Sequence, residues 1–133
     1  MGKSFELQMK EFENMTAEKS ELLFKKVCFD LSNSIIMDTA VLSGAARGRW
    51  APDINKIDNS TDEVFDKSGN STVVKVATQT NNLKIGQFFT LTNNLPYILR
   101  LEYGWSKKSP NGMLGINVMR FQNFLNKANK DLN

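Results

Sequence analysis

The chain has 133 residues, of which 41% are hydrophobic and 23% are charged. This length and composition predict one globular domain with a single core and exclude disordered and fibrous proteins. Seventeen basic and fourteen acidic residues give a net charge of +3, which is weak evidence for a nucleic-acid partner. The single cysteine excludes an internal disulfide and fits a reducing compartment.

The residue inventory argues against catalysis. The chain contains no histidine, so Ser/His/Asp and Cys/His arrangements and histidine metal sites cannot be built. The glycines form neither a P-loop nor a dinucleotide fingerprint. The acidic residues of the segment Asp53–Ser71 do not have the spacing of a calcium-binding loop. We therefore predict a protein that is not an enzyme and has no cofactor or metal.

The N-terminal segment 1–15 is predicted to form a short helical arm of the single domain 1–133. Phe5, Met9 and Phe12 follow an i, i+4, i+7 spacing, which predicts two turns of amphipathic helix. So short a helix needs a surface to lie on, either its own subunit or a neighbour. Charges of both signs interrupt its apolar residues, so we expect no signal peptide, and no later stretch is apolar enough to predict a membrane span.

A long helix follows, from about Ala17 to Ala40. Thr16 is a suitable N-cap and Glu18 suits the positive end of the helix. Apolar residues then recur at helical spacing, namely Phe24, Val27, Cys28, Leu31 and Ile35. Cys28 lies in this stripe, so we expect a buried core thiol and not a nucleophile.

The next segment is rich in small residues and contains two arginines. Gly44 and Gly48 allow the backbone to turn or to approach another segment closely. Arg47 and Arg49 have two interpretations: contact with phosphate or carboxylate groups, or a solvated or intrachain role. Trp50 is expected to be a core or interface anchor.

The middle of the chain predicts a small antiparallel sheet. One strand is expected near Arg49–Ile54, followed by a long polar loop over Asp53–Ser71. The β-branched run Thr72–Thr78 predicts a second strand, which we expect to pair with a third at Gly86–Asn93. The long helix should lie on this sheet, which gives an α+β fold.

The last third predicts a short helix over Tyr97–Tyr103, a loop over Gly104–Gly112 and a final helix from Leu114. The final helix has an apolar stripe made of Leu114, Val118, Phe121, Leu125, Ala128 and Leu132. Its other face should meet solvent or the lumen of an assembly, and carries Asn117, Arg120, Asn123 and Lys127.

Two groups of motifs resemble those of a known family. The first is Asn93-Asn94-Leu95-Pro96-Tyr97, followed by Leu101-Glu102-Tyr103-Gly104-Trp105-Ser106-Lys107 and Pro110-Asn111-Gly112-Met113. The second, upstream, is Ser43-Gly44 with Arg47-Gly48-Arg49-Trp50. Their order and spacing resemble the neck or tail-completion proteins of tailed bacteriophages, over roughly Met37–Phe124.

The resemblance implies a tail-terminator-like α+β fold and a virion structural protein. Such a subunit would form a homo-oligomeric ring at the head-tail junction or the top of the tail, a hexamer or alternatively a dodecamer. Its partners would be the head-tail connector, the tail tube or sheath proteins, and the genomic DNA that passes through the ring. It would be made in the bacterial host cytoplasm and function in the virion, without a membrane.

The candidate contact residues come from both motif groups. They are Arg47, Arg49, Trp50, Tyr97, Arg100, Glu102, Tyr103, Trp105, Lys107 and Lys108. Tyrosine and tryptophan are common interface anchors, and the Arg100/Glu102 pair could set the register with a neighbour. Tyr97 has core and interface interpretations, and the basic residues are candidates to face DNA or another ring. The rival hypothesis is a small monomeric nucleic-acid-binding module that uses the same basic and aromatic residues.

Overall fold

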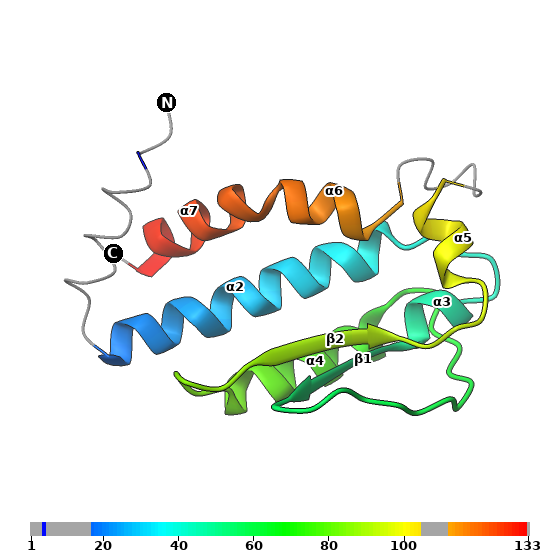
Figure 1. Cartoon of the computed structure of the whole chain (residues 1–133), viewed down its shortest axis with the longest axis horizontal. Helices are drawn as coiled ribbons and strands as arrows, with labels where there is room; N and C mark the ends of the chain where they lie inside the picture. Colours follow the sequence, from blue (N-terminus) through cyan, green and yellow to red (C-terminus); the bar gives the residue numbers. More distant parts are fainter. Residues whose placement is uncertain (1–3, 5–16, 105–111, 133) are drawn as a thin grey trace.

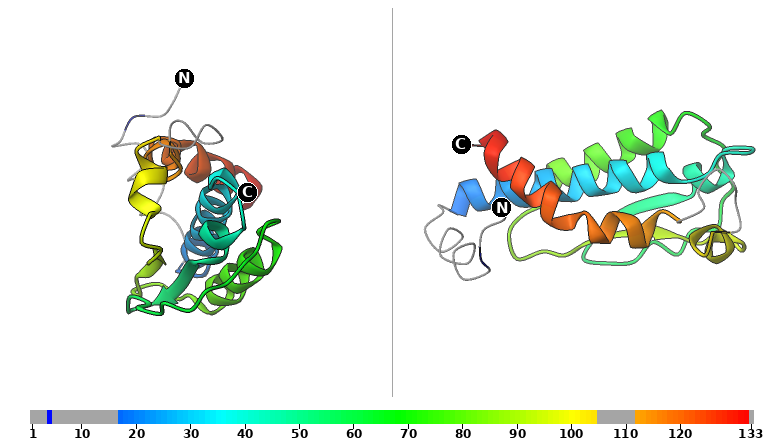
Figure 2. Two further views of the ribbon diagram at one scale, coloured as in Figure 1. Left: turned by 90° about the vertical axis from the view of Figure 1, so that its right-hand side faces the viewer. Right: turned by 90° about the horizontal axis from the view of Figure 1, so that it is seen from above.

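The computed structural model describes residue 4 and residues 17–104 and 112–132. The expected α+β architecture is confirmed. The long helix α2 (Ala17–Asp38) lies in the centre. Helices α6 (Leu114–Met119) and α7 (Phe121–Leu132) cover one side of it, and the sheet and helix α4 (Asn70–Asn82) lie on the other (Figures 1 and 2).

Helix α2 is packed from both sides, which explains why its buried face is broader than the predicted stripe. Val27 and Ile35 are buried as expected, but so are Leu23, Ser32 and Ile36. The N-terminal half packs on Ala128 of α7, whereas Ile35 and Ile36 belong to the core cluster with Trp50 and Val76. Cys28 is half-buried, and burial raises the pKa of its thiol to about 11, so the group stays protonated at neutral pH.

The sheet has two strands, β1 (Trp50–Ile54) and β2 (Phe89–Asn93), which pair antiparallel. Trp50 lies opposite Asn93 and Pro52 opposite Leu91. The strands predicted near Arg49–Ile54 and within Gly86–Asn93 are therefore confirmed, although the second is shorter than predicted. Phe89 and Leu91 pack against the core cluster, which fixes the register because a one-residue shift would turn them away from the core.

The prediction of a strand at Thr72–Thr78 is wrong, and so is its pairing with the strand at Gly86–Asn93. These residues lie in helix α4, where Thr72, Val76 and Thr80 are buried along one face at helical spacing. Helix α4 packs against α2 and β1. Burial of that face outweighs the modest β preference of valine and threonine.

Asp66 caps the start of helix α4 from the end of the predicted loop. Its carboxylate accepts hydrogen bonds from the backbone N–H groups of Gly69 and Thr72, at 3.0 and 2.9 Å, and from the hydroxyl of Thr72 at 2.8 Å. Burial alone would raise the pKa of Asp66, but these hydrogen bonds, with one from Ser68, hold it below its usual value. A capped first turn favours helix for the residues that follow.

The C-terminal helix also differs from the prediction. It divides at Arg120 into α6 and α7. Ala128 is buried as expected, whereas Val118 is 62% exposed and Asn117, predicted to face solvent or a lumen, is fully buried. Polar partners inside the fold explain the burial of Asn117. An amide whose polar atoms have hydrogen-bond partners loses little free energy when it leaves water.

Candidate subunit interface

The two groups of motifs meet at one end of the molecule. The upstream group forms helix α3 (Ala45–Gly48) and the start of β1, and the downstream group forms the end of β2 and helix α5 (Ile98–Glu102). The amide of Asn93 donates a hydrogen bond to the carbonyl of Ala46 at 2.8 Å. Leu95 packs against Ala45 and Ala46 in a small buried cluster. Segments far apart in the sequence thus form one structural unit.

Glycine allows the long loop to lie against this unit. Gly44 has a φ of +90°, and a Cβ placed there would lie 2.6 Å from the backbone nitrogen of Lys67. A Cβ on Gly48 would collide with the backbone carbonyl of Val64. The N–H of Asp66 also donates to the carbonyl of Gly44 at 3.0 Å. The close approach predicted for these glycines is therefore to the loop of the same chain.

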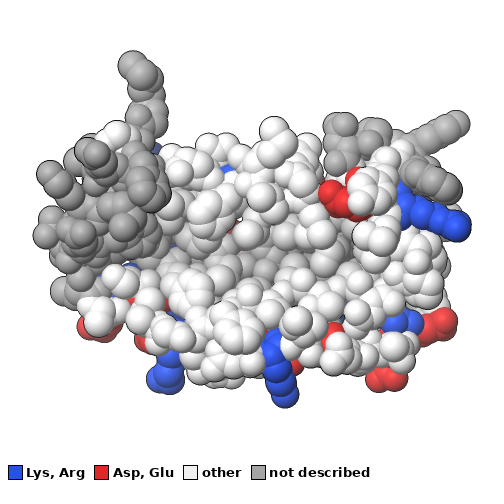
Figure 3. Space-filling view, viewed as in Figure 1, with Lys and Arg blue, Asp and Glu red and all other residues white. Residues whose placement is uncertain are grey.

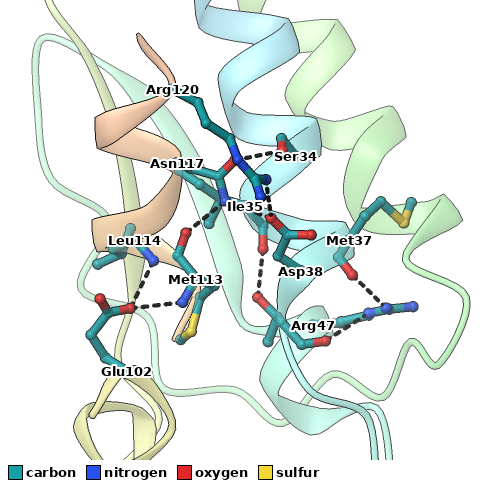
Figure 4. Close-up of polar contacts among 11 residues, drawn as sticks. Ser34, Ile35, Met37, Asp38, Arg47, Glu102, Met113, Leu114, Asn117 and Arg120 are labelled. Atoms are coloured by element: carbon teal, nitrogen blue, oxygen red, sulfur yellow. Dashed lines mark hydrogen bonds and ion pairs between the residues drawn. The ribbon is translucent and has the colours of Figure 1, made fainter. Parts of the chain in front are cut away.

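Arg47 makes contacts within its own chain, as the second of its two interpretations predicted. Its guanidinium donates to the backbone carbonyls of Met37, Thr39 and Lys67, at 2.8, 3.1 and 2.8 Å. Figure 4 shows it below the end of α2, pointing at the last carbonyls of that helix. A guanidinium is well suited to satisfy carbonyls that have no partner within a helix. Arg47 therefore joins α2, α3 and the loop before α4.

Trp50 belongs to the core, which corrects its place among the predicted contact residues. Its side chain is 2% exposed, and its indole N–H donates to the hydroxyl of Thr39 at 2.9 Å. That hydroxyl in turn donates to the carbonyl of Ile35 at 2.7 Å. Arg49 beside it is half-buried, and its Nε atom has no hydrogen-bond partner among the described residues.

Glu102 joins α5 to the start of α6. One carboxylate oxygen accepts from the N–H groups of Met113 and Leu114, at 3.0 and 2.7 Å (Figure 4). The other oxygen accepts from the N–H of Gly115 at 2.9 Å. Burial alone would raise the pKa of Glu102, but these three hydrogen bonds hold it below its usual value. The carboxylate is engaged within the chain, so the predicted register contact with a neighbour would have to come from Arg100.

A polar network fixes α6 to the end of α2 (Figure 4). The Asn117 amide donates to the Asp38 carboxylate at 2.9 Å and to the Met113 carbonyl at 2.7 Å, and accepts from the Ser34 hydroxyl. Arg120 forms an ion pair with Asp38 at 3.2 Å. Sequence periodicity missed Asn117, because its burial depends on partners from α2 that lie far away in the sequence.

Helix α5 presents apolar side chains outward. Tyr97 is 42% exposed, Leu99 64% and Tyr103 76%, and the side chain of Arg100 is also exposed. We call these four residues the α5 surface. Tyr97 therefore lies at the surface and not in the core. Trp105, Lys107 and Lys108, and most of the predicted loop Gly104–Gly112, lie outside the described residues.

Sequence analysis missed two other exposed apolar groups. Ile57 and Phe65, each 60% exposed, lie on the long loop that was predicted to be polar. Met119, 86% exposed, lies with Val118 next to the break between α6 and α7. The single-helix prediction could not place this exposed group, because the break at Arg120 interrupts the assumed stripe.

Charged groups are unevenly distributed over one face. In Figure 3 the centre of the face, over the middle of α2 and β2, is almost free of charged atoms, which gather along the lower edge and at the right-hand end. An uncharged face is a poor surface for a phosphate backbone, whose binding depends on lysine and arginine. The same face is suitable for contact with protein.

Within residues 17–104 and 112–132, no three histidine, cysteine, aspartate or glutamate side chains are grouped in a way that could hold a metal ion. Among the described helices, none has the length and apolar character needed to span a membrane. In comparisons with family models, curated proteins and solved structures, the chain gives no match.

Proposed function

We propose that this chain is a structural subunit of the neck of a tailed bacteriophage. It forms a homo-oligomeric ring, a hexamer or alternatively a dodecamer, at the head-tail junction or the top of the tail. The ring joins the connector to the tail tube or sheath proteins and encloses the passage of the genomic DNA. The subunit is made in the host cytoplasm and has no catalytic role.

One observation carries the proposal. The two motif groups that resemble the neck proteins fold together at one end of the molecule, through Asn93, Leu95 and helix α3. The outer side of this unit is the α5 surface, with exposed Leu99 and Tyr103. Tyrosine and leucine left in water cost free energy that contact with another subunit recovers. A ring requires such a surface to fit a different patch on the next copy.

The structure also favours the ring over the nucleic-acid module. Arg47, the basic residue of the upstream motif with the most contacts, is bonded to three backbone carbonyls. Three of the five N–H donors of its guanidinium are therefore engaged within the chain, which leaves two for a phosphate. Arg49 is half-buried, so both arginines of the upstream motif are less accessible to DNA than exposed side chains.

Native mass spectrometry and negative-stain electron microscopy of the purified chain test the proposal. We expect rings in the unmodified protein, and their loss in the double variant Leu99→Ser with Tyr103→Ser, with the fold retained by circular dichroism. Val74→Ser is the matched control, because Val74 is 63% exposed on α4, away from the α5 surface. A monomer at every concentration, with tight DNA binding that weakens steeply with salt, would support the rival instead.

A further inference from the structure

Strand β2 forms an open edge of the sheet. Just after β1, the N–H of Asn55 donates to the carbonyl of Phe88 at 2.9 Å, which continues the register of the β1–β2 pairs. Hydrogen-bonded pairs alternate along an antiparallel ladder, so the backbone groups of Phe89 and Leu91 point away from β1. In the described part of the chain the sheet has only two strands. No third strand there covers the outer edge of β2.

The other edge of the sheet is protected against strand pairing. By the same alternation, Pro52 and Ile54 carry the outward-facing backbone groups of β1. Proline has no N–H to donate. The N–H of Ile54 already donates to the carboxylate of Asp53 at 2.9 Å. Proline and charged side chains are the usual means by which edge strands avoid pairing with another chain, so β1 is a poor partner for a further strand.

Strand β2 lacks these protections. It contains neither proline nor a charged residue, and no charge occurs from Ile85 to Leu99. The strand lies on the side of the molecule that faces the viewer in Figure 1 (Figures 1 and 2), and the centre of that face is almost free of charged atoms (Figure 3). Around a twofold axis, a charged residue on the edge would face a like charge of the second copy. The uncharged edge therefore favours a second copy of the chain as its occupant.

We propose that β2 pairs antiparallel with β2 of a second copy, in a register centred on Leu91. Leu91 then lies opposite its own copy, and Phe89 lies opposite Asn93. All three are outward-facing residues, so each such pair exchanges two hydrogen bonds. A shift of one residue would place an outward-facing residue opposite an inward-facing one, and a shift of two would pair fewer residues. The two sheets thus become one sheet of four strands.

The side chains of β2 suit this register. Phe89 and Leu91 pack against the core cluster of their own chain, and side chains alternate along a strand, so Thr90 and Thr92 lie on the other face. Thr90 of each copy would lie opposite Thr92 of the other, and cross-strand threonine pairs stabilise a sheet. The contact is isologous, whereas a ring contact is heterologous. The inference therefore goes beyond the proposed ring and does not depend on it.

Disulfide trapping in the full chain tests the register. The variants Thr90→Cys and Thr92→Cys are each made in a Cys28→Ser background, which removes the native thiol. Opposite residues of a non-hydrogen-bonded pair have Cα atoms about 4.5 Å apart, which a disulfide can span. We expect mild oxidation of the equimolar mixture to give covalent dimers severalfold faster than oxidation of either variant alone. Each variant alone is the matched control, because neither position lies opposite itself.

A charge exchange gives a second measurement by sedimentation. Thr90→Lys with Thr92→Lys places like charges opposite each other in the pair, whereas Thr90→Glu with Thr92→Lys places opposite charges there. We expect self-association to be severalfold weaker in the first variant, with the fold of both retained by circular dichroism. All chains in this measurement also carry Leu99→Ser and Tyr103→Ser, which remove the proposed ring contact. Failure of the ring and failure of the β2 pair are thus told apart.

Three results would overturn the inference. Equal crosslinking rates in the mixture and in the single variants would contradict the register. Equal self-association of the two charge variants would place the contact elsewhere on the chain. If the edge is instead covered by a different protein, the chain by itself stays monomeric in the background without the ring contact, and the mixture of cysteine variants gives no covalent dimer.

Discussion

The carboxylate of Glu102 accepts a hydrogen bond from the backbone N–H of Leu114 at 2.7 Å. The same oxygen binds the N–H of Met113, and the other oxygen binds that of Gly115. One side chain therefore satisfies the exposed donors at the start of α6 and fixes α5 in place. The exposed Leu99 and Tyr103 of the α5 surface depend on this joint for their position.

Replacing Glu102 by Gln should lower the free energy of unfolding at pH 7 by roughly 1–2 kcal/mol, because three charge-assisted hydrogen bonds become neutral or are lost. Urea denaturation measures the change. Glu63→Gln is the control, since Glu63 is exposed on the long loop and should change stability by less than about 0.5 kcal/mol. Equal effects of the two substitutions would show that the joint is not stabilising.

The pH dependence of stability should reflect the same joint. Because the pKa of Glu102 is lowered in the folded chain, its contribution is fully present above the unfolded pKa of about 4.3 and is lost as the pH falls through the folded pKa. The Gln variant should therefore lose less stability than the unmodified chain between about pH 5 and pH 2. Parallel pH profiles would contradict this assignment.

Substitution of Arg47 by Met should destabilise the fold by about 2 kcal/mol. It removes the donors to Met37, Thr39 and Lys67, and charge-assisted hydrogen bonds are worth more than neutral ones. Thermal or urea unfolding measures the loss. Lys127→Met is the control, because Lys127 is exposed on α7. If Arg47→Met instead leaves stability unchanged and abolishes DNA binding, the intrachain role is not its main role.

Gly48→Ala should destabilise the chain more than Gly86→Ala. The added methyl at position 48 meets the backbone carbonyl of Val64, which cannot move without displacing the long loop. Overpacking of this kind costs about 1–3 kcal/mol. At Gly86 nothing lies within 4 Å, and only its φ of +92° opposes alanine, at about 1 kcal/mol. Paired unfolding curves give the comparison, and the reverse order would contradict the close approach.

Asp66→Asn should weaken helix α4 and cost about 1 kcal/mol. The variant keeps the shape of the cap but loses the negative charge of the carboxylate, which accepts hydrogen bonds from Gly69 and Thr72. Hydrogen exchange should speed up in the first turn of α4. Asp62→Asn provides the control, because Asp62 is exposed on the same loop. Similar exchange in both variants would show that Asp66 does not set the start of the helix.

The sequence by itself determined the elements whose signals are local. The helix α2, the two true strands, the loop after β1 and the short helix α5 all follow from spacing, turn residues and proline. The predicted cap of α2, Thr16, lies outside the described residues. The importance of Gly44 and Gly48 was also visible, because glycine marks close approach. The segment that they approach was not visible, since it lies on a distant part of the chain.

Only the tertiary structure decided the rest. The run Thr72–Thr78 fits a strand by composition and a helix by the spacing of Thr72, Val76 and Thr80; packing against α2 selects the helix. Helical spacing alone predicts that Asn117 faces solvent, whereas in the structure it is buried by hydrogen bonds with Ser34 and Asp38. The sequence predicts Arg47 and Trp50 as subunit contact residues, whereas in the structure they donate hydrogen bonds to Met37 and Thr39 at the end of α2. In each case the deciding free energy comes from residues on another element of the fold, which local patterns do not contain.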